Sequence, residues 1–185
     1  MPDNELSHYA VSVVGADRPG IVAGVAKALY TLGCNIADSS CTMLAGEFAM
    51  ILIISHPKPF TKTQLFEELK PVSERMAMTL SIRHLPRGEE KRRETGGEIC
   101  RITVYGADQP GIVYRVTDNL ASRRINIIDL KSKLIEMGSE PVYVMLLEAL
   151  LPDTITPEDV EYLLEGLKQE LKVEINVRIV TPVEF

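Results

Sequence analysis

Apolar residues recur along this chain at two spacings, one typical of helices and the other typical of strands. Ile21, Val25 and Leu29 follow one another at intervals of four, which predicts a helix. Residues 172–180 alternate between apolar and polar, which predicts a strand. The whole pattern predicts helices at 20–32, 61–76, 111–122 and 157–171, and strands at 8–14, 35–44, 48–55, 79–85, 99–105, 125–135, 142–149 and 172–180.

Two prolines affect the predicted helices differently. Pro157 follows Thr156, a good N-cap residue, and proline is favoured at a helix start because its missing N–H is not needed there. Pro71 lies inside the helix predicted at 61–76, where we expect it to kink or shorten the helix.

One strand–loop–helix signature occurs twice in the chain. Residues 13–22 read VVGADRPGIV and residues 104–113 read VYGADQPGIV, and the match continues without a gap into the next strand. Each copy has the predicted order strand, helix, strand, strand, helix, strand. We therefore expect an α+β protein with two ferredoxin-like βαββαβ units, each a four-stranded antiparallel sheet with two helices on one face.

The composition between the two copies indicates a linker. Residues 86–97 are mostly charged or polar and end in two glycines. The predicted organisation is a first domain at 1–85, a charged linker at 86–97 and a second domain at 98–185.

The overall charge disfavours direct binding to nucleic acid. The chain has 26 acidic and 20 basic side chains and a net charge of −6, whereas nucleic-acid binding needs a basic surface that displaces counterions. No apolar run approaches the ~20 residues of a membrane helix. The polar, acidic N-terminus lacks the features of a secretory signal. We expect a cytoplasmic protein that binds neither nucleic acid nor membrane.

Residue types that serve catalysis or metal binding are scattered. Cys34, Cys41 and Cys100 are odd in number and lack C-x-x-C spacing, so we interpret them as small buried thiols and not as disulfide partners or zinc ligands. The three histidines stand singly along the chain. The sequence shows no nucleophile–base pair, metal-ligand spacing or phosphate-binding loop, so we expect no catalytic residues, no metal site, no cofactor and no enzymatic activity.

The repeated loop carries the residue types of an anion-binding helix start. Asp17 can cap the following helix, Pro19 lies near its first turn, and Gly20 leaves the backbone open to close approach. A helix N-terminus with open amides binds carboxylates and phosphates. The same residues also make a good helix start without any ligand, and the sequence leaves both interpretations open.

A second repeated element follows at the entry to the next strand. Asn35 and Asp38 in the first copy match Asn126 and Asp129 in the second. An asparagine side chain offers donors and an acceptor, so it can contact both the amino group and the carboxylate of an amino acid. The alternative is that these asparagines only serve a turn.

Together, the G-x-D-x-P-G-I-V loop and the N-I-x-D element resemble the ACT domain, a small-molecule regulatory module, in both copies. The tandem arrangement, without a catalytic or DNA-binding domain, is similar to the glycine cleavage system transcriptional repressor family. In ACT domains an amino acid binds near this loop, often at an interface between two units. The resemblance implies ligand-binding residues at Asp17, Arg18, Pro19, Gly20, Ile21, Asn35 and Asp38 in the first copy and at Asp108, Gln109, Pro110, Gly111, Ile112, Asn126 and Asp129 in the second.

The resemblance also implies a function and partners. We expect a homo-oligomeric regulatory protein that senses a small amino acid such as glycine or serine and modulates a protein partner. Transcriptional control of glycine or one-carbon metabolism is the process it suggests, with a separate DNA-binding regulator as the partner. The alternative is a ligand-independent interaction or dimerisation module. Because Arg18 and Gln109 differ at equivalent positions, the two sites need not act alike.

Overall fold

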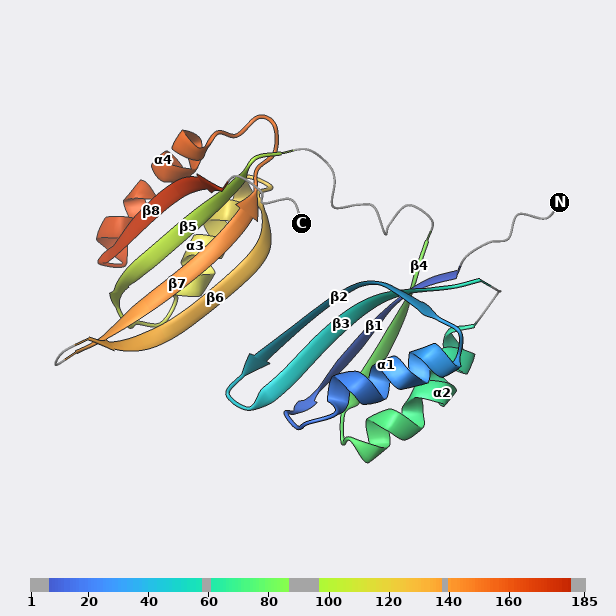
Figure 1. Ribbon diagram of the computed structural model, residues 1–185. Coiled ribbons are helices and arrows are strands. Elements are labelled where there is room, and N and C mark those ends of the chain that lie inside the picture. The colour runs from blue at the N-terminus through green and yellow to red at the C-terminus, as the bar shows by residue number, and fades with distance from the viewer. Residues whose placement is uncertain (1–6, 58–60, 87–96, 138–139, 181–185) are drawn as a thin grey trace. The chain divides into compact units, whose positions relative to one another are not determined.

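The computed structural model describes residues 7–57, 61–86, 97–137 and 140–180. The chain divides into two compact units, Met1–Glu94 and Thr95–Phe185, each with its own sheet and helices (Figure 1). Of the linker predicted at 86–97, only the first and last residues are among the described ones.

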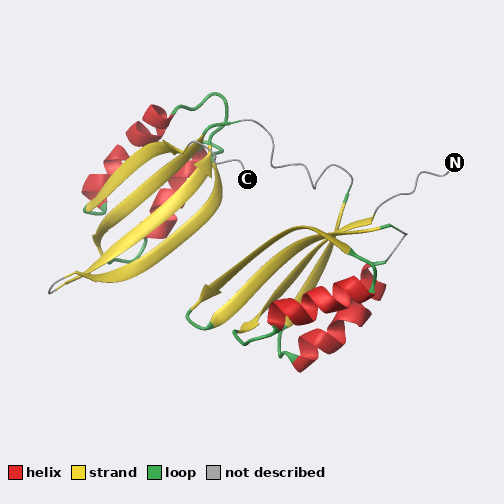
Figure 2. Cartoon of the chain, viewed as in Figure 1, coloured by secondary structure: helices red, strands yellow, loops and turns green. Residues whose placement is uncertain are grey.

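Both units have the order strand–helix–strand–strand–helix–strand. The first consists of β1 (Ser7–Ala16), α1 (Ile21–Thr31), β2 (Asn35–Leu44), β3 (Glu47–His56), α2 (Lys62–Arg75) and β4 (Thr79–Leu85). The second consists of β5 (Ile99–Ala107), α3 (Ile112–Ser122), β6 (Asn126–Met137), β7 (Glu140–Leu150), α4 (Pro157–Glu170) and β8 (Val173–Val180). The sheets are antiparallel, in the orders β2-β3-β1-β4 and β6-β7-β5-β8. Figure 2 shows both helices of each unit on one face of its sheet, so the predicted fold class is confirmed.

Each core lies between the sheet and its two helices. The residues that predicted the first helix, Ile21, Val25 and Leu29, form its buried face. They belong to one cluster with inward residues of β1 such as Val11 and Val13, and the second unit has an equivalent cluster. Burying an aliphatic side chain contributes roughly 1.5–3 kcal/mol, so these stripes hold each helix on its sheet.

Of the two effects expected of Pro71, a kink or a shortened helix, the shortening does not occur. The helix α2 continues from Lys62 through Pro71 to Arg75. Because proline has no N–H, Pro71 cannot donate a hydrogen bond to the carbonyl of Glu67 one turn earlier. Both residues are exposed. Water can therefore satisfy that carbonyl.

The edge strands β2 and β6 share an irregularity near their starts. In β2 the pairing with β3 shifts between Ile36 and Asp38, and in β6 the pairing with β7 shifts between Ile127 and Asp129. A bulge of this kind reorients the side chains around it. The repeat therefore extends to backbone detail that the residue pattern does not reveal.

Candidate functional site

The first repeated loop connects β1 to α1 and is exposed from Asp17 to Gly20. The Asp17 N–H donates to the Gly46 carbonyl at 2.8 Å, which ties the loop to the turn between β2 and β3. The prediction that Asp17 caps the helix is wrong, because α1 begins at Ile21 and Gly20 occupies the capping position. Gly20 has φ 94°, a left-handed backbone conformation that favours glycine at this position.

The helices that follow the repeated loops differ from the other two at their N-termini. The helices α2 and α4 each have a complete capping box, Thr61 with Gln64 and Thr156 with Asp159. Among the described residues, no side chain caps α1 or α3, and neither first turn contains an acidic residue. An uncapped N-terminus has unpaired N–H groups and a partial positive charge, so it attracts carboxylates.

A groove between α1 and β2 begins beside the uncapped end of α1. Val22 and Ala26 line it from the helix, and Ser39 and Cys41 line it from the strand. Its volume is about 160 Å³, which is comparable to about five water molecules at ~30 Å³ each. The groove therefore has room for a small molecule. The sequence did not reveal these residues, because the bulge in β2 hides which side chains face the helix.

The two predicted halves of the site lie at opposite ends of the first sheet. Asn35 pairs with Ser55, which in turn pairs with His8 near the start of β1. The loop follows Ala16 at the other end of β1. At ~3.3 Å per residue along the strand, the loop lies ~26 Å from the position of Asn35 and ~20 Å from that of Asp38. A ligand that contacts this loop therefore cannot also contact Asn35 or Asp38 of the same unit. That Asn35 and Asp38 contact a ligand remains a prediction.

Exposure separates the predicted loop residues into two groups. Ile21 and Ile112 are 2% exposed and belong to the cores, so a ligand can reach only their backbone. Gln109 is half-buried. The residues whose side chains or backbone are exposed are Asp17, Arg18, Pro19, Gly20, Asp108, Pro110 and Gly111.

The second repeated loop has the same backbone but different contacts. Gly111 also adopts a left-handed conformation, with φ 98°. Nε2 of Gln109 donates a hydrogen bond to the Leu171 carbonyl at the end of α4. At the equivalent position in the first loop, Arg18 has no hydrogen bond or ion pair with any described residue. The second loop is therefore anchored through Gln109, whereas the Arg18 guanidinium is available to a ligand.

Beside the second loop, two of the positions equivalent to the groove carry larger side chains. Thr117 takes the place of Ala26, and Leu130 takes the place of Ser39. The pairing of β6 with β7 places Asn126 at the far end of the sheet, as the pairing of β2 places Asn35. The two copies therefore share a helix start but not the space beside it.

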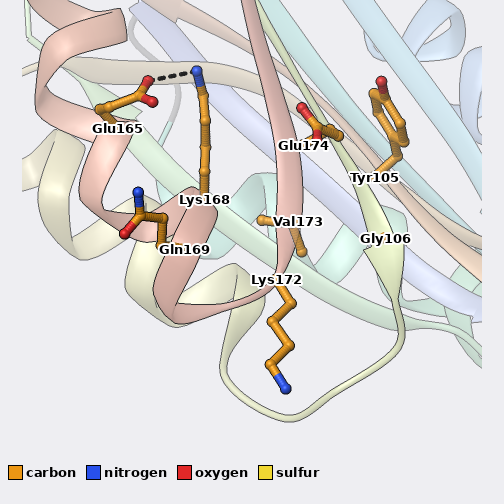
Figure 3. A pocket seen from close by; sticks show the side chains of 8 residues that line it. All are labelled: Tyr105, Gly106, Glu165, Lys168, Gln169, Lys172, Val173 and Glu174. Carbon is orange, nitrogen blue, oxygen red and sulfur yellow. Dashed lines mark hydrogen bonds and ion pairs between the residues drawn. The ribbon is translucent and has the colours of Figure 1, made fainter.

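A wider hollow lies in the second unit, near α4 and β8. It has a volume of about 650 Å³ and is lined by Tyr105, Gly106, Glu165, Lys168, Gln169, Lys172, Val173 and Glu174. Figure 3 shows the α4 side chains on one side of β8 and Tyr105 and Glu174 on the other. Lys168 Nζ already pairs with Glu165 at 2.5 Å. The hollow thus surrounds an edge strand and does not enclose a small ligand.

The three thiols differ in environment, contrary to the expectation that all are buried. Cys100 is fully buried, and burial raises the pKa of its thiol from 9.0 to about 11. Cys34 is half-buried, and burial raises its pKa as well. Cys41 is exposed because it lies on the uncovered edge strand β2, where it lines the groove.

The histidines have structural surroundings. The ring of His56 is buried, and its Nε2 lies 3.1 Å from the Leu32 carbonyl, which joins the end of β3 to the end of α1. His84 packs edge-on against Tyr9 with ring centroids 5.2 Å apart. In the described part of the chain, no three metal-binding side chains cluster, and no helix has the length and apolarity to cross a membrane.

Comparison with known proteins identifies both units. The ACT domain family matches residues 8–83 and 98–178. This chain belongs to the ACT domain family. Its two ACT domains stand in tandem, which confirms the resemblance drawn from the repeated loop and the N-I-x-D element.

Related proteins align either with both ACT domains of this chain or with a single one. The glycine cleavage system transcriptional repressor of Escherichia coli strain K12 is 27% identical over 176 residues, covering 94% of this chain and 90% of that protein. A UPF0237 protein of Methanocaldococcus jannaschii is 40% identical over 81 residues, 43% of this tandem ACT-domain chain and 89% of its own length. Among solved structures, an unknown protein from Galdieria sulphuraria has a TM-score of 0.81 at 26% identity, covering 96% of this chain and all of that one.

Proposed function

We propose that this tandem ACT-domain protein is a regulator that binds a small amino acid at its first ACT domain and thereby modulates a protein partner. The observation that carries the proposal is the uncapped N-terminus of α1 beside the groove. The ligand carboxylate would accept from the N–H groups of the first helical turn. Ser39 of β2 and Val22 and Ala26 of α1 line the groove and would contact the rest of the ligand.

The differences between the two copies support the first domain as the binding domain. Leu130 and Thr117 fill space that Ser39 and Ala26 leave open in the first domain. Gln109 holds the second loop to α4. In this proposal the second domain keeps the fold of a sensor but serves a structural or partner-binding role.

The proposed process is transcriptional control of glycine metabolism, which rests on the name of the Escherichia coli relative. The net charge of −6 supports action through a separate DNA-binding protein, because contact with DNA phosphates needs a basic surface. Glycine and serine are the proposed ligands because the groove is small. Such a ligand can alter partner binding only if it prefers one conformation of the protein.

Titration calorimetry with a panel of amino acids tests this proposal. We expect one site per chain for a small amino acid, and Ser39→Leu should weaken binding at least about tenfold. Leucine occupies the equivalent position in β6, so the fold accommodates it on this strand. The matched control, Leu130→Ser, should leave the affinity unchanged. Binding of no amino acid by folded protein would refute the sensor.

A ligand-independent interaction module is a second candidate, favoured by the edge strand β2. This strand is exposed along its whole length, and Met43 and Leu44 are 63% and 74% exposed. An uncovered edge of this kind is a template for pairing with another chain. Alanine at Asn35 or Asn126 distinguishes the two functions, because only an interaction module would change its partner binding when no ligand is present.

A further inference from the structure

Another hollow of the second ACT domain lies at the end of the sheet opposite the repeated loop. Three segments form it: the turn after α3, the connection from β7 to α4, and the first two turns of α4. Its volume is about 490 Å³, which lies within the ~300–1,000 Å³ that is usual for small-molecule pockets. We call it the α3–α4 pocket, and it is lined by Arg123, Ile125, Thr154, Ile155, Asp159, Tyr162 and Leu163.

Backbone hydrogen bonds hold the walls of the α3–α4 pocket in place. The N–H groups of Arg123 and Ile125 both donate to the Leu120 carbonyl at 3.1 Å, which fixes the turn after α3. In the connection from β7 to α4, the Ile155 N–H donates to the Pro152 carbonyl at 2.9 Å, and the capping box of α4 follows directly. The walls are therefore formed without a ligand, so binding would require little ordering of the chain.

The α3–α4 pocket has an apolar floor and an aromatic residue at its rim. Ile125 is 4% exposed and belongs to the core of the second domain. Ile155 and Leu163 are half-buried and pack against the same core. Tyr162 lines the pocket but is 87% exposed, so its ring is accessible to a bound molecule. An aromatic ring and an aliphatic floor together favour a ligand with a planar, apolar body.

The two charged residues of the α3–α4 pocket differ in how far their hydrogen-bonding groups are used. The Asp159 Oδ2 accepts from the N–H and the hydroxyl of Thr156 at 2.9 and 3.1 Å. These bonds chiefly lower the pKa of Asp159, and the nearby charge of Arg123 adds to the effect. The Arg123 guanidinium makes no hydrogen bond with any residue that the structure describes. Its paired N–H donors, which match a carboxylate in geometry, are therefore open to a ligand.

The first domain has other side chains at the positions that carry this chemistry. Leu32 takes the place of Arg123, and Glu67 takes the place of Tyr162. The shared fold therefore requires neither the cation nor the aromatic ring. The same comparison supplies substitutions that the fold already accommodates.

We propose that the α3–α4 pocket binds a small carboxylate with a planar, apolar body, such as an aromatic acid. The Arg123 guanidinium would donate to the carboxylate, and the Tyr162 ring would pack on the body above the apolar floor. An apolar pocket with a few placed polar groups is the usual form of a small-molecule site. This inference gives the second domain a ligand of its own and does not depend on amino-acid binding at the groove beside α1.

Titration of the full chain with cinnamate, followed by amide chemical shifts in nuclear magnetic resonance, tests the proposal. Cinnamate is a planar aromatic carboxylate, and cinnamamide is its neutral analogue. Cinnamate should shift the amides of Ile125, Ile155 and Leu163 with saturation and a dissociation constant below about 1 mM. Cinnamamide should bind at least about tenfold more weakly, because it cannot form a charged pair with Arg123.

Two variants take their residues from the first domain. Arg123→Leu should abolish the preference for cinnamate over cinnamamide, and Tyr162→Glu should weaken the binding of both at least about fivefold. The matched controls, Leu32→Arg and Glu67→Tyr, should leave both affinities unchanged. The proposal would be overturned by the absence of saturable shifts at the pocket, by shifts confined to the groove beside α1, or by a preference for the anion that survives Arg123→Leu. Circular dichroism confirms that each variant is folded.

Discussion

At the scale of single residues, the backbone of Gly20 and Gly111 gives a direct prediction. Both have φ above 90° just before a helix, where a side chain is strained. Alanine at either position should lower the free energy of unfolding by about 1–2 kcal/mol in urea denaturation. Gly166 is the control, because it lies inside α4 with open space around it. Gly166→Ala should stabilise by about 0.5–1 kcal/mol; a stabilising Gly20→Ala would contradict the assigned backbone.

The cysteines give a second residue-scale prediction. Cys41 should react with a thiol reagent within minutes at pH 8, whereas Cys100 should react only after unfolding. Burial raises the pKa of Cys100 from 9.0 to about 11, so the folded state holds this proton more tightly than the unfolded state. The resulting stabilisation is fully present below pH 9 and is lost as pH rises to 11. A Cys41→Ser variant that still reacts rapidly would contradict these environments.

The residues of the site show what the sequence could and could not predict. The repeated loop correctly marked where the helices start, because glycine before an apolar stripe is a local signal, but the expected cap by Asp17 is wrong. It did not show that Asp17 binds the turn at Gly46 through its backbone, because that contact depends on strand pairing. Nor could it show that Asn35 lies at the other end of the sheet, since antiparallel register is a tertiary property.

At the scale of elements, the capping boxes predict a difference between the helices. Thr156 accepts from the Asp159 N–H, and the Asp159 carboxylate accepts from the Thr156 N–H and hydroxyl. Thr156→Ala should therefore cost about 1 kcal/mol of unfolding free energy at pH 7. Thr63→Ala, on the exposed side of α2, is the control and should cost nothing.

The pH dependence of the same helix start has a definite sign. The hydrogen bonds from Thr156 lower the pKa of Asp159. The stability from this carboxylate is present above its unfolded pKa and is lost as pH falls through the lower folded value. Thermal unfolding from pH 7 to pH 2 should show the difference between wild type and Thr156→Ala shrinking with acid. A difference independent of pH would contradict the capping role of Asp159.

The order and type of every helix and strand followed from the sequence, and β2 and β4 begin and end where predicted. Such elements can be predicted locally, because apolar residues at helical or strand spacing form a single face that must be buried. The exposed strand β2 was predicted by its β-forming residues and its repeat. Its bulge and its groove were not, since both arise from pairing with β3 and packing beside α1.

At the scale of the whole molecule, one fold occurs twice with different surfaces. The cores of the two ACT domains are equivalent, yet a groove opens beside α1 of the first domain, where the second domain has larger residues at two equivalent positions. This difference supports the first domain as the proposed ligand-binding domain. The second domain keeps a charged, solvated sheet and an anchored loop.

The central claim is that the uncapped start of α1 binds the carboxylate of a small amino acid. Amide chemical shifts from nuclear magnetic resonance, recorded while glycine and then serine are titrated into the full chain, test it most directly. The amides of Ile21, Val22 and Ala23 should shift together with saturation, and those of the capped start of α2 at Lys62 and Thr63 should not. Shifts confined to the hollow near Lys172, or no shifts at saturating amino acid, would contradict the claim.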